Sequence, residues 1–260
     1  MVCHILPCKK AGDFQRRQQE GGFFTGLIAD ARSIAKRDPA ARSTAEVFFL
    51  YPGFHALVYH KVAAFFYRIK LKFIARLVSQ IGSRRTGVEI HPGAKIGSGL
   101  FIDHGKGIVI GETAVVGNNC TIYHQVTLGG NGHEKHCKRH PTIGDNVLIG
   151  AGAKILGPVT IGDNALIGAG SVVVNDVPAN ATVTGMKARV IKIDGEYTDE
   201  HGELPSVALN QTNIPDPVAQ ELSQLKAQME ELSKQVKEND SKIREYESII
   251  AKYESSEDKK

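Results

Sequence analysis

The residues of this chain best suited to chemistry are histidines that stand in two short irregular stretches of sequence. His104 follows Asp103 and is closely followed by Gly105 and Gly107, which let a ligand or another backbone approach. Histidine titrates near neutral pH, so His104 could act as a general base if a neighbouring group fixed its tautomer. A solvated turn histidine is the alternative, and spacing alone does not separate the two.

The second irregular stretch, HEKHCKRH at 133–140, contains three histidines and a cysteine. It does not match the HExxH pattern of zinc enzymes, because Cys137 stands where the second histidine is needed, so we expect no metal site. Arg139 is suited to hold a carboxylate through two parallel hydrogen bonds. We therefore interpret the stretch as a basic loop that binds substrate.

Both stretches interrupt a repeat of six residues that runs through 89–178. A period of six is typical of a hexapeptide β-helix, in which three sextets form one triangular coil. Ile110 follows Ile102 by eight positions and Ile143 follows Leu128 by fifteen, where the repeat predicts six. Both histidine stretches therefore lie in insertions. The aliphatic residues of the repeat, expected to point inward, are Ile90, Ile96, Ile102, Ile110, Val116, Ile122, Leu128, Ile143, Ile149, Ile155, Ile161, Ile167 and Val173.

Two kinds of helical pattern flank the repeat. Before it, apolar spacing broken at Asp38–Pro39 and Pro52–Gly53 predicts two or three helices in an α-helical domain over 21–86. After it, apolar residues alternate at spacings of three and four through five heptads, which predicts a coiled coil over 218–256. A single helix docked on the body is the alternative.

The predicted fold class is therefore mostly β, with a left-handed parallel β-helix of hexapeptide repeats over 87–194. A short α-helical domain precedes it and a C-terminal coiled-coil helix follows. Residues 1–20 are polar and lack periodicity, so we expect them to be disordered, and 195–217 have the composition of a linker.

Composition excludes several classes of protein. The net charge of +4 comes from interspersed acids and bases, which does not favour a nucleic-acid binder. No run of about 18 apolar residues exists, so we expect no membrane span. The first thirty residues lack an apolar block, so a signal peptide is not expected. The four cysteines lack paired spacing, and a cytoplasmic protein with reduced thiols fits best.

Several segments together resemble one family of hexapeptide acyltransferases. They are RDPAARSTAEVFFLYPGFHAL, EIHPGAKIGSGLFIDHGKGIVIGETA, TLGG, RHPTIG and GAGAKILGPVTIGDNALIGAGSVV, and they span about residues 25–190. They closely resemble serine O-acetyltransferase. The resemblance implies transfer of an acetyl group from acetyl-CoA to the L-serine hydroxyl, giving O-acetylserine and CoA as the first step of cysteine biosynthesis.

The resemblance also implies the roles of the catalytic and ammonium-binding residues. His104 is similar to the general base that takes the serine hydroxyl proton. Glu89 stands at the position of its acidic partner, where many members have Asp. Asp38 and Asp103 match the acids that hold the substrate amino group. For Asp38, a helix cap or turn residue is the alternative interpretation of the sequence, and for Glu89 a solvated corner of the β-helix.

Four more positions match the rest of the family's site. Arg139 matches the residue that holds the serine carboxylate, and His140 lies beside it. Gly130 and Ala151 match backbone positions that line the acetyl-CoA channel. The resemblance implies no permanently bound cofactor, because acetyl-CoA is a co-substrate.

The family also implies assembly. The resemblance implies a trimer in which each active site lies between neighbouring β-helices, so we expect a homotrimer. Long members use a larger helical region to join two trimers, and this chain has only about sixty helical residues there. Many members end in an Ile that inserts into O-acetylserine sulfhydrylase, whereas this chain ends in Glu-Asp-Lys-Lys, so we do not expect that complex.

Two alternatives remain open from the sequence. Another hexapeptide acyltransferase would act on a sugar or antibiotic hydroxyl, although Asp38, Asp103 and Arg139 favour a zwitterionic substrate. A non-catalytic β-helix would serve as a scaffold or as a metal protein of the carbonic-anhydrase kind.

Overall fold

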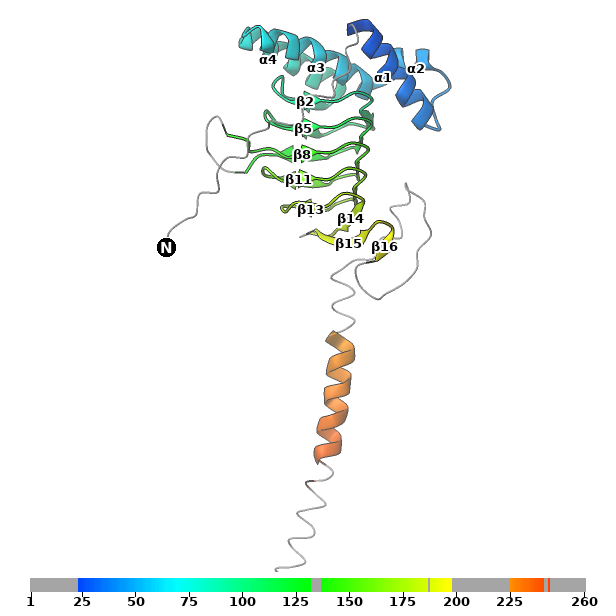
Figure 1. Ribbon diagram of the computed structural model, residues 1–260, viewed down its shortest axis with the longest axis vertical. Helices are drawn as coiled ribbons and strands as arrows, with labels where there is room; N and C mark the ends of the chain where they lie inside the picture. The colour runs from blue at the N-terminus through cyan, green and yellow to red at the C-terminus, as the bar shows by residue number, and fades with distance from the viewer. Residues whose placement is uncertain (1–22, 132–136, 187, 198–224, 241–242, 244–260) are drawn as a thin grey trace, which may run out of the picture. The chain divides into compact units, whose positions relative to one another are not determined.

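The six-residue repeat folds into short strands that stack as the three faces of a triangular solenoid (Figure 1). This computed structural model describes residues 23–131, 137–186, 188–197, 225–240 and 243 of the 260. Consecutive coils pair in parallel throughout the repeat. The predicted mostly β solenoid is confirmed, while the handedness of its coils stays a prediction.

Every third strand pairs with its counterpart in the next coil, which gives three sheets. Sheet A contains β1 (Val88–Ile90), β4 (Ile108–Ile110), β7 (Thr127–Gly129), β10 (Lys154–Leu156) and β13 (Val172–Val173). Sheet B contains β2 (Lys95–Ile96), β5 (Val115–Val116), β8 (Thr142–Ile143) and β11 (Thr160–Ile161). Sheet C contains β3 (Phe101–Asp103), β6 (Thr121–Tyr123), β9 (Leu148–Ile149), β12 (Leu166–Ile167), β14 (Ala181–Thr184), β15 (Arg189–Ile193) and β16 (Glu196–Tyr197).

The aliphatic residues of the repeat form the core of the solenoid. Each aligns with its equivalent in the next coil, as Ile110 does with Leu128 and Leu128 with Ile155. All thirteen predicted positions are buried except Ile96, which is partly buried. Burying such a side chain contributes about 1.5–3 kcal/mol. The inward stack therefore holds the fold, and the outward side chains and the corners between sheets are left for chemistry.

The last part of the solenoid changes direction. β14 pairs in parallel with β12, but β15 and β16 then turn back as antiparallel neighbours. A repeat array needs an atypical terminal unit to cover its last coil, and this hairpin-like end provides one.

Four helices precede the solenoid, where the sequence predicted two or three. They are α1 (Phe23–Arg37), α2 (Thr44–Leu50), α3 (Pro52–Arg68) and α4 (Lys72–Thr86). The breaks at Asp38–Pro39 and at Pro52 lie where they were predicted. The turn between α3 and α4 was missed, because it contains no glycine or proline and instead places Lys70 in the left-handed region with φ 65°.

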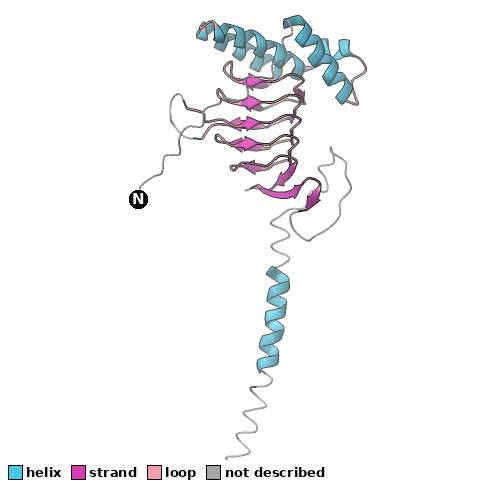
Figure 2. Cartoon of the chain, viewed as in Figure 1, coloured by secondary structure: helices cyan, strands magenta, loops and turns pink. Residues whose placement is uncertain are grey.

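Helices α3 and α4 lie across the end of the solenoid that carries β1 and β2 (Figures 1 and 2). The contact of α3 with β3 is very close. A Cβ added at Gly53 would lie 2.2 Å from the Ile102 carbonyl oxygen, so only glycine fits there. This contact fixes the start of α3 beside Asp103.

Residues 215–260 form a second compact unit, in which 225–240 are helical. The predicted disordered segment 1–20 and most of the predicted linker 195–217 lie outside the described residues. Among the residues that are described, no helix combines the length and the apolar character that a membrane span requires.

Candidate active site

Most of the polar residues predicted from the sequence lie on two different edges of the triangular coil, together with neighbours that were not predicted. The chain runs from sheet A to sheet B to sheet C in each coil. One group, which we call the acidic corner, lies at the edge between sheets C and A and consists of Asp38, Tyr51, Asp103, His104 and Tyr123. The other, the basic corner, lies at the edge between sheets A and B and consists of His91, Glu112, Thr113, Arg139 and His140.

His104 projects from the acidic corner into solvent. Its backbone adopts the left-handed conformation with φ 50°, and its side chain is 84% exposed. Several other turn residues of the solenoid share this conformation, among them Asn119 and Gln125, so it belongs to the turns of the coils. The His104 Nε2 lies 3.7 Å from the Asp103 Oδ1. The insertion of two residues therefore turns the chain so that an accessible imidazole stands beside a carboxylate.

Asp38 reaches this corner from the loop between α1 and α2. The Tyr51 hydroxyl donates to its Oδ2 at 2.7 Å, and the Ala40 N–H donates to its Oδ1 at 2.8 Å. The pKa of Tyr51 is raised to about 12, first by burial and then by this hydrogen bond. Sequence reasoning missed Tyr51, whose only local signal is its place before Pro52–Gly53.

The carboxylate of Asp103 lies in an environment that disfavours its charge. Burial raises its pKa, and the nearby Asp38 raises it further, whereas His104 lowers it. The pKa of Tyr123 is also raised, by burial and then by the charges of Asp103 and Asp38. Two neighbouring carboxylates under partial burial would be stabilised by a cation, so this corner is suited to an ammonium group.

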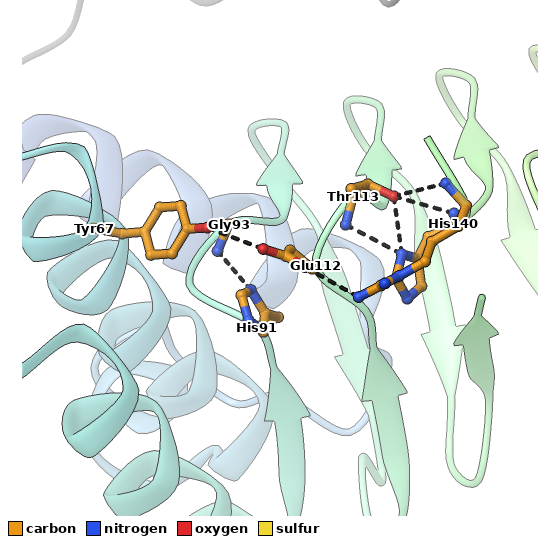
Figure 3. Close-up of polar contacts among 7 residues, drawn as sticks. Tyr67, His91, Gly93, Glu112, Thr113 and His140 are labelled. Carbon is orange, nitrogen blue, oxygen red and sulfur yellow. Dashed lines mark hydrogen bonds and ion pairs between the residues drawn. The ribbon is translucent and has the colours of Figure 1, made fainter. Parts of the chain in front are cut away.

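The basic corner is a connected network (Figure 3). The Arg139 Nη2 lies 3.1 Å from the Glu112 Oε2, and the Tyr67 hydroxyl of α3 donates to the Glu112 Oε1 at 3.1 Å. The Thr113 hydroxyl oxygen accepts from the backbone N–H groups of Arg139 and His140, each at 3.1 Å. These bonds hold the end of the long insertion against the preceding coil.

His140 is held as a neutral imidazole. Its residue is only 7% exposed, and its pKa is lowered first by burial and then by the charges of Arg139 and Lys138. The Thr113 backbone N–H donates to its Nδ1 at 3.2 Å, so the proton belongs on Nε2. A Cβ added at Gly130 would lie 3.1 Å from that Nε2. A Cβ at Gly111 would collide with the same edge of the ring, so the two glycines make room for the imidazole.

The remaining predicted residues fall on both edges and on the face between them. Glu89 projects outward from β1, in register with Val109. The pKa of His91 is lowered, first by burial, and the charge of Glu89 opposes this only in small part, after that of Glu112. Among the hydrogen bonds of the described residues, none joins Glu89 to His104. Ala151 lies on the edge of the acidic corner, two coils beyond His104, and its carbonyl accepts from the Gly170 N–H at 2.8 Å.

No group of three metal-binding side chains occurs among the described residues, which do not include His133 and His136.

Sequence reasoning also missed Glu112, Thr113 and His91. Their only signal is position, because all three stand at the same corner of successive coils as Arg139 and His140.

Comparison with known proteins places this arrangement among acyltransferases. Residues 140–175 match the family model described as bacterial transferase hexapeptide (six repeats). A serine acetyltransferase of Synechococcus elongatus is 50% identical over 185 residues, which cover 70% of this chain and 75% of the relative.

Solved structures agree. The crystal structure of the Neisseria gonorrhoeae serine acetyltransferase has a TM-score of 0.65 and 46% identity, covering 67% of this chain and 68% of that one. A soybean serine acetyltransferase complexed with serine has a TM-score of 0.62 and 46% identity, covering 64% and 68%.

Proposed function

Because the chain belongs to the serine acetyltransferase family, it acetylates the hydroxyl of serine, and we propose that its acidic and basic corners are two halves of one active site. The family sets aside the two alternatives left open by the sequence, a sugar acceptor and a non-catalytic scaffold. The two corners divide the work of binding serine and activating its hydroxyl.

The acidic corner is proposed to bind the serine ammonium and to activate the hydroxyl. Asp38 and Asp103 supply the two carboxylates for the ammonium. His104 takes the hydroxyl proton as the oxygen attacks the thioester carbonyl, and we assign to Glu89 the task of orienting that histidine. A serine hydroxyl is a poor nucleophile until a base removes its proton, so the exposed imidazole is the group that the reaction needs.

The basic corner is proposed to bind the serine carboxylate. Arg139 supplies the planar guanidinium, and the Nε2–H of His140 supplies a second donor beside it. In the single chain the guanidinium faces the carboxylate of Glu112, 3.1 Å away. That pairing keeps Arg139 oriented for a second carboxylate arriving at the same edge.

The observation that carries this proposal is the separation of the two corners on different edges. Each strand of sheet A that lies between the edges is two or three residues long, and a three-residue strand spans about 10 Å at about 3.3 Å per residue. The ammonium and carboxylate of one serine are attached to the same carbon atom. One serine is therefore better bridged by the acidic corner of one subunit and the basic corner of a neighbour, and repetition of this contact closes a ring of three.

We infer that acetyl-CoA is the acetyl donor and acts as a co-substrate. Ala151 lies on the same edge as His104, and the intervening coil is stacked between them, with the Gly152 N–H donating to the His124 carbonyl at 2.9 Å. A thioester extended along this edge would bring its carbonyl to His104. Gly130, on the neighbour's basic edge, would line the opposite wall.

A cytoplasmic location completes the proposal. Cys120 is buried in the core without a disulfide, which suits a compartment that keeps thiols reduced.

Two serine analogues test the charge assignments. Ethanolamine lacks the carboxylate and 3-hydroxypropanoate lacks the ammonium, and each should be acetylated at least about tenfold less efficiently than L-serine, since a charged hydrogen bond contributes about 1.5–3 kcal/mol. Arg139→Ala should reduce the difference in kcat/KM between serine and ethanolamine, but not that between serine and 3-hydroxypropanoate. Asp38→Asn should have the opposite pattern. Equal kcat/KM for serine and ethanolamine in the wild type would contradict the basic corner.

A further inference from the structure

The helix of the second compact unit carries an apolar seam that nothing in the described structure covers. Its apolar residues are more than half exposed: Leu225 57%, Met229 70%, Leu232 60%, Val236 58% and Ile243 53%. These are all the large apolar residues among the described residues of this unit. An isolated helix of this length is marginal in water, so the seam must be covered for the helix to persist.

The width of the seam identifies what covers it. Met229, Val236 and Ile243 occupy the a positions of consecutive heptads, and Leu225 and Leu232 occupy d positions. The flanking e and g positions are polar, with Gln228, Lys226, Ser233, Gln235 and Asp240. A helix docked on a globular body presents a wider apolar stripe, whereas a strict a/d seam is the surface of a helix that pairs with others like itself.

One polar residue sets the direction of pairing. Asn239 falls at a d position, where its amide would be buried among apolar side chains. In a parallel, in-register assembly, equivalent asparagines meet and satisfy one another, whereas an antiparallel assembly would place each against an apolar residue. The sequence therefore favours parallel copies of the same helix.

We propose that the partner of this seam is the tail of two further copies of the chain, joined as a parallel three-stranded coiled coil that holds the subunits of the enzyme together. The number three rests on the proposed active site between subunits. By threefold symmetry, equivalent tails leave the assembly at the same end. Tethering makes their meeting intramolecular, which strengthens the body contacts in return. The coiled coil would therefore affect catalysis, because an active site divided between subunits is lost when the subunits separate.

The test compares two full-length variants with equal charge changes. Met229→Glu with Val236→Glu places two negative charges in the seam. Ala227→Glu with Lys234→Gln changes the net charge by the same amount on the outer face of the helix. Sedimentation gives the mass of each protein, and the specific activity is followed on serial dilution.

The seam variant should lose half of its specific activity at a concentration about 10²-fold higher than the wild type, within the 10²–10⁴-fold range of avidity gained by linking contacts. The outer-face variant should follow the wild type, and both should be trimers when concentrated. Identical dilution curves for the seam variant and the wild type would overturn the proposal, as would a wild-type monomer or an assembly of six joined through its tails. If all three proteins are trimers but none acetylates serine, the proposed function fails. The proposal about the tail is then still tested by the masses and by the helix content, measured by circular dichroism at 222 nm.

Discussion

At the scale of single residues, Asp38 combines two tasks that the sequence presented as alternatives. Its Oδ1 accepts from the Ala40 N–H, as a turn residue does, and its Oδ2 accepts from the Tyr51 hydroxyl at the acidic corner. The turn that ends α1 thus also aims the carboxylate. A side chain fixed by two donors loses little freedom when an ammonium binds to it.

Tyr51→Phe tests this arrangement. The change removes one donor to Asp38, and a hydrogen bond to a charged group contributes about 1.5–3 kcal/mol, so the KM for serine should rise roughly tenfold. The kcat should change less, and the KM for acetyl-CoA should not change. Tyr59→Phe, within α3 and packed on Gly82, is the control and should leave all three constants unaltered. A Tyr51→Phe enzyme with wild-type KM for serine would remove Tyr51 from the site.

The residues that sequence reasoning found and missed differ in how locally they are encoded. Asp103 and His104 stand together in an insertion of the repeat, and Arg139 and His140 stand together in another. Tyr51 and Glu112 are tied to their partners across 13 and 27 residues, respectively. No motif relates residues so far apart. Only the stacking of coils and the packing of α3 bring them together.

At the scale of elements, helix α3 determines how the helical domain meets the solenoid. Its first turn packs on β3 through Gly53, and its last turn supplies Tyr67 to the basic corner. Both polar corners therefore depend on one rigid element of 17 residues.

Gly53→Ala should disturb both stability and activity. The added Cβ would lie 2.2 Å from the Ile102 carbonyl oxygen, which belongs to the backbone and cannot rotate away. Overpacking of this kind costs about 1–3 kcal/mol, measured by urea denaturation, and the displaced Tyr51 should raise the KM for serine. In the matched variant Gly26→Ala, the nearest atom is the Lys61 Nζ at 3.6 Å, an ordinary van der Waals distance, and stability should not fall. Equal stability of the two variants would refute the close contact.

The packing of α3 on α4 predicts sensitivity to acid. His60 is buried against this interface, and its pKa is lowered from 6.5 to about 4, first by burial and then by Lys61 and His91. The unfolded chain therefore binds a proton at this residue at a higher pH than the folded chain does, and the folded state loses stability as the pH falls from about 6.5 toward 4.

His60→Leu should flatten that part of the stability–pH curve, measured as urea unfolding at several pH values. His104→Asn removes an exposed histidine and should leave the slope unchanged. A slope that is the same in His60→Leu and the wild type would show that other groups cause the acid sensitivity.

The elements themselves were predictable to different degrees. The sextets identified the inward residues of the solenoid, because a period of six leaves no other residue to fill the interior. The turn at Lys70 was not predictable, since it contains neither glycine nor proline. The antiparallel β15 and β16 were missed although Asp194–Gly195 between them, both with positive φ, is a hairpin signal, because these strands do not continue the repeat. Tertiary packing places the turn, and the need to cover the last coil places the strands.

At the scale of the whole molecule, the central feature is the separation of complementary charges on two edges of one solenoid. The sequence located both insertions but not the edges, because the edge that an insertion occupies depends on its phase in an eighteen-residue coil of three sextets. In a ring of three, every acidic corner would face a neighbour's basic corner. Each subunit would then contribute to two active sites.

Coexpression of two inactive variants tests this claim most directly. His104→Ala should lose about 10²–10⁴-fold in turnover while still binding acetyl-CoA, and Arg139→Ala should be nearly inactive at low serine. In mixed trimers, an Arg139→Ala subunit supplies an intact acidic corner and a neighbouring His104→Ala subunit supplies an intact basic corner. Random assembly from equal amounts should restore about a quarter of the sites. Activity no greater than the mean of the two separate variants would contradict a site shared between subunits.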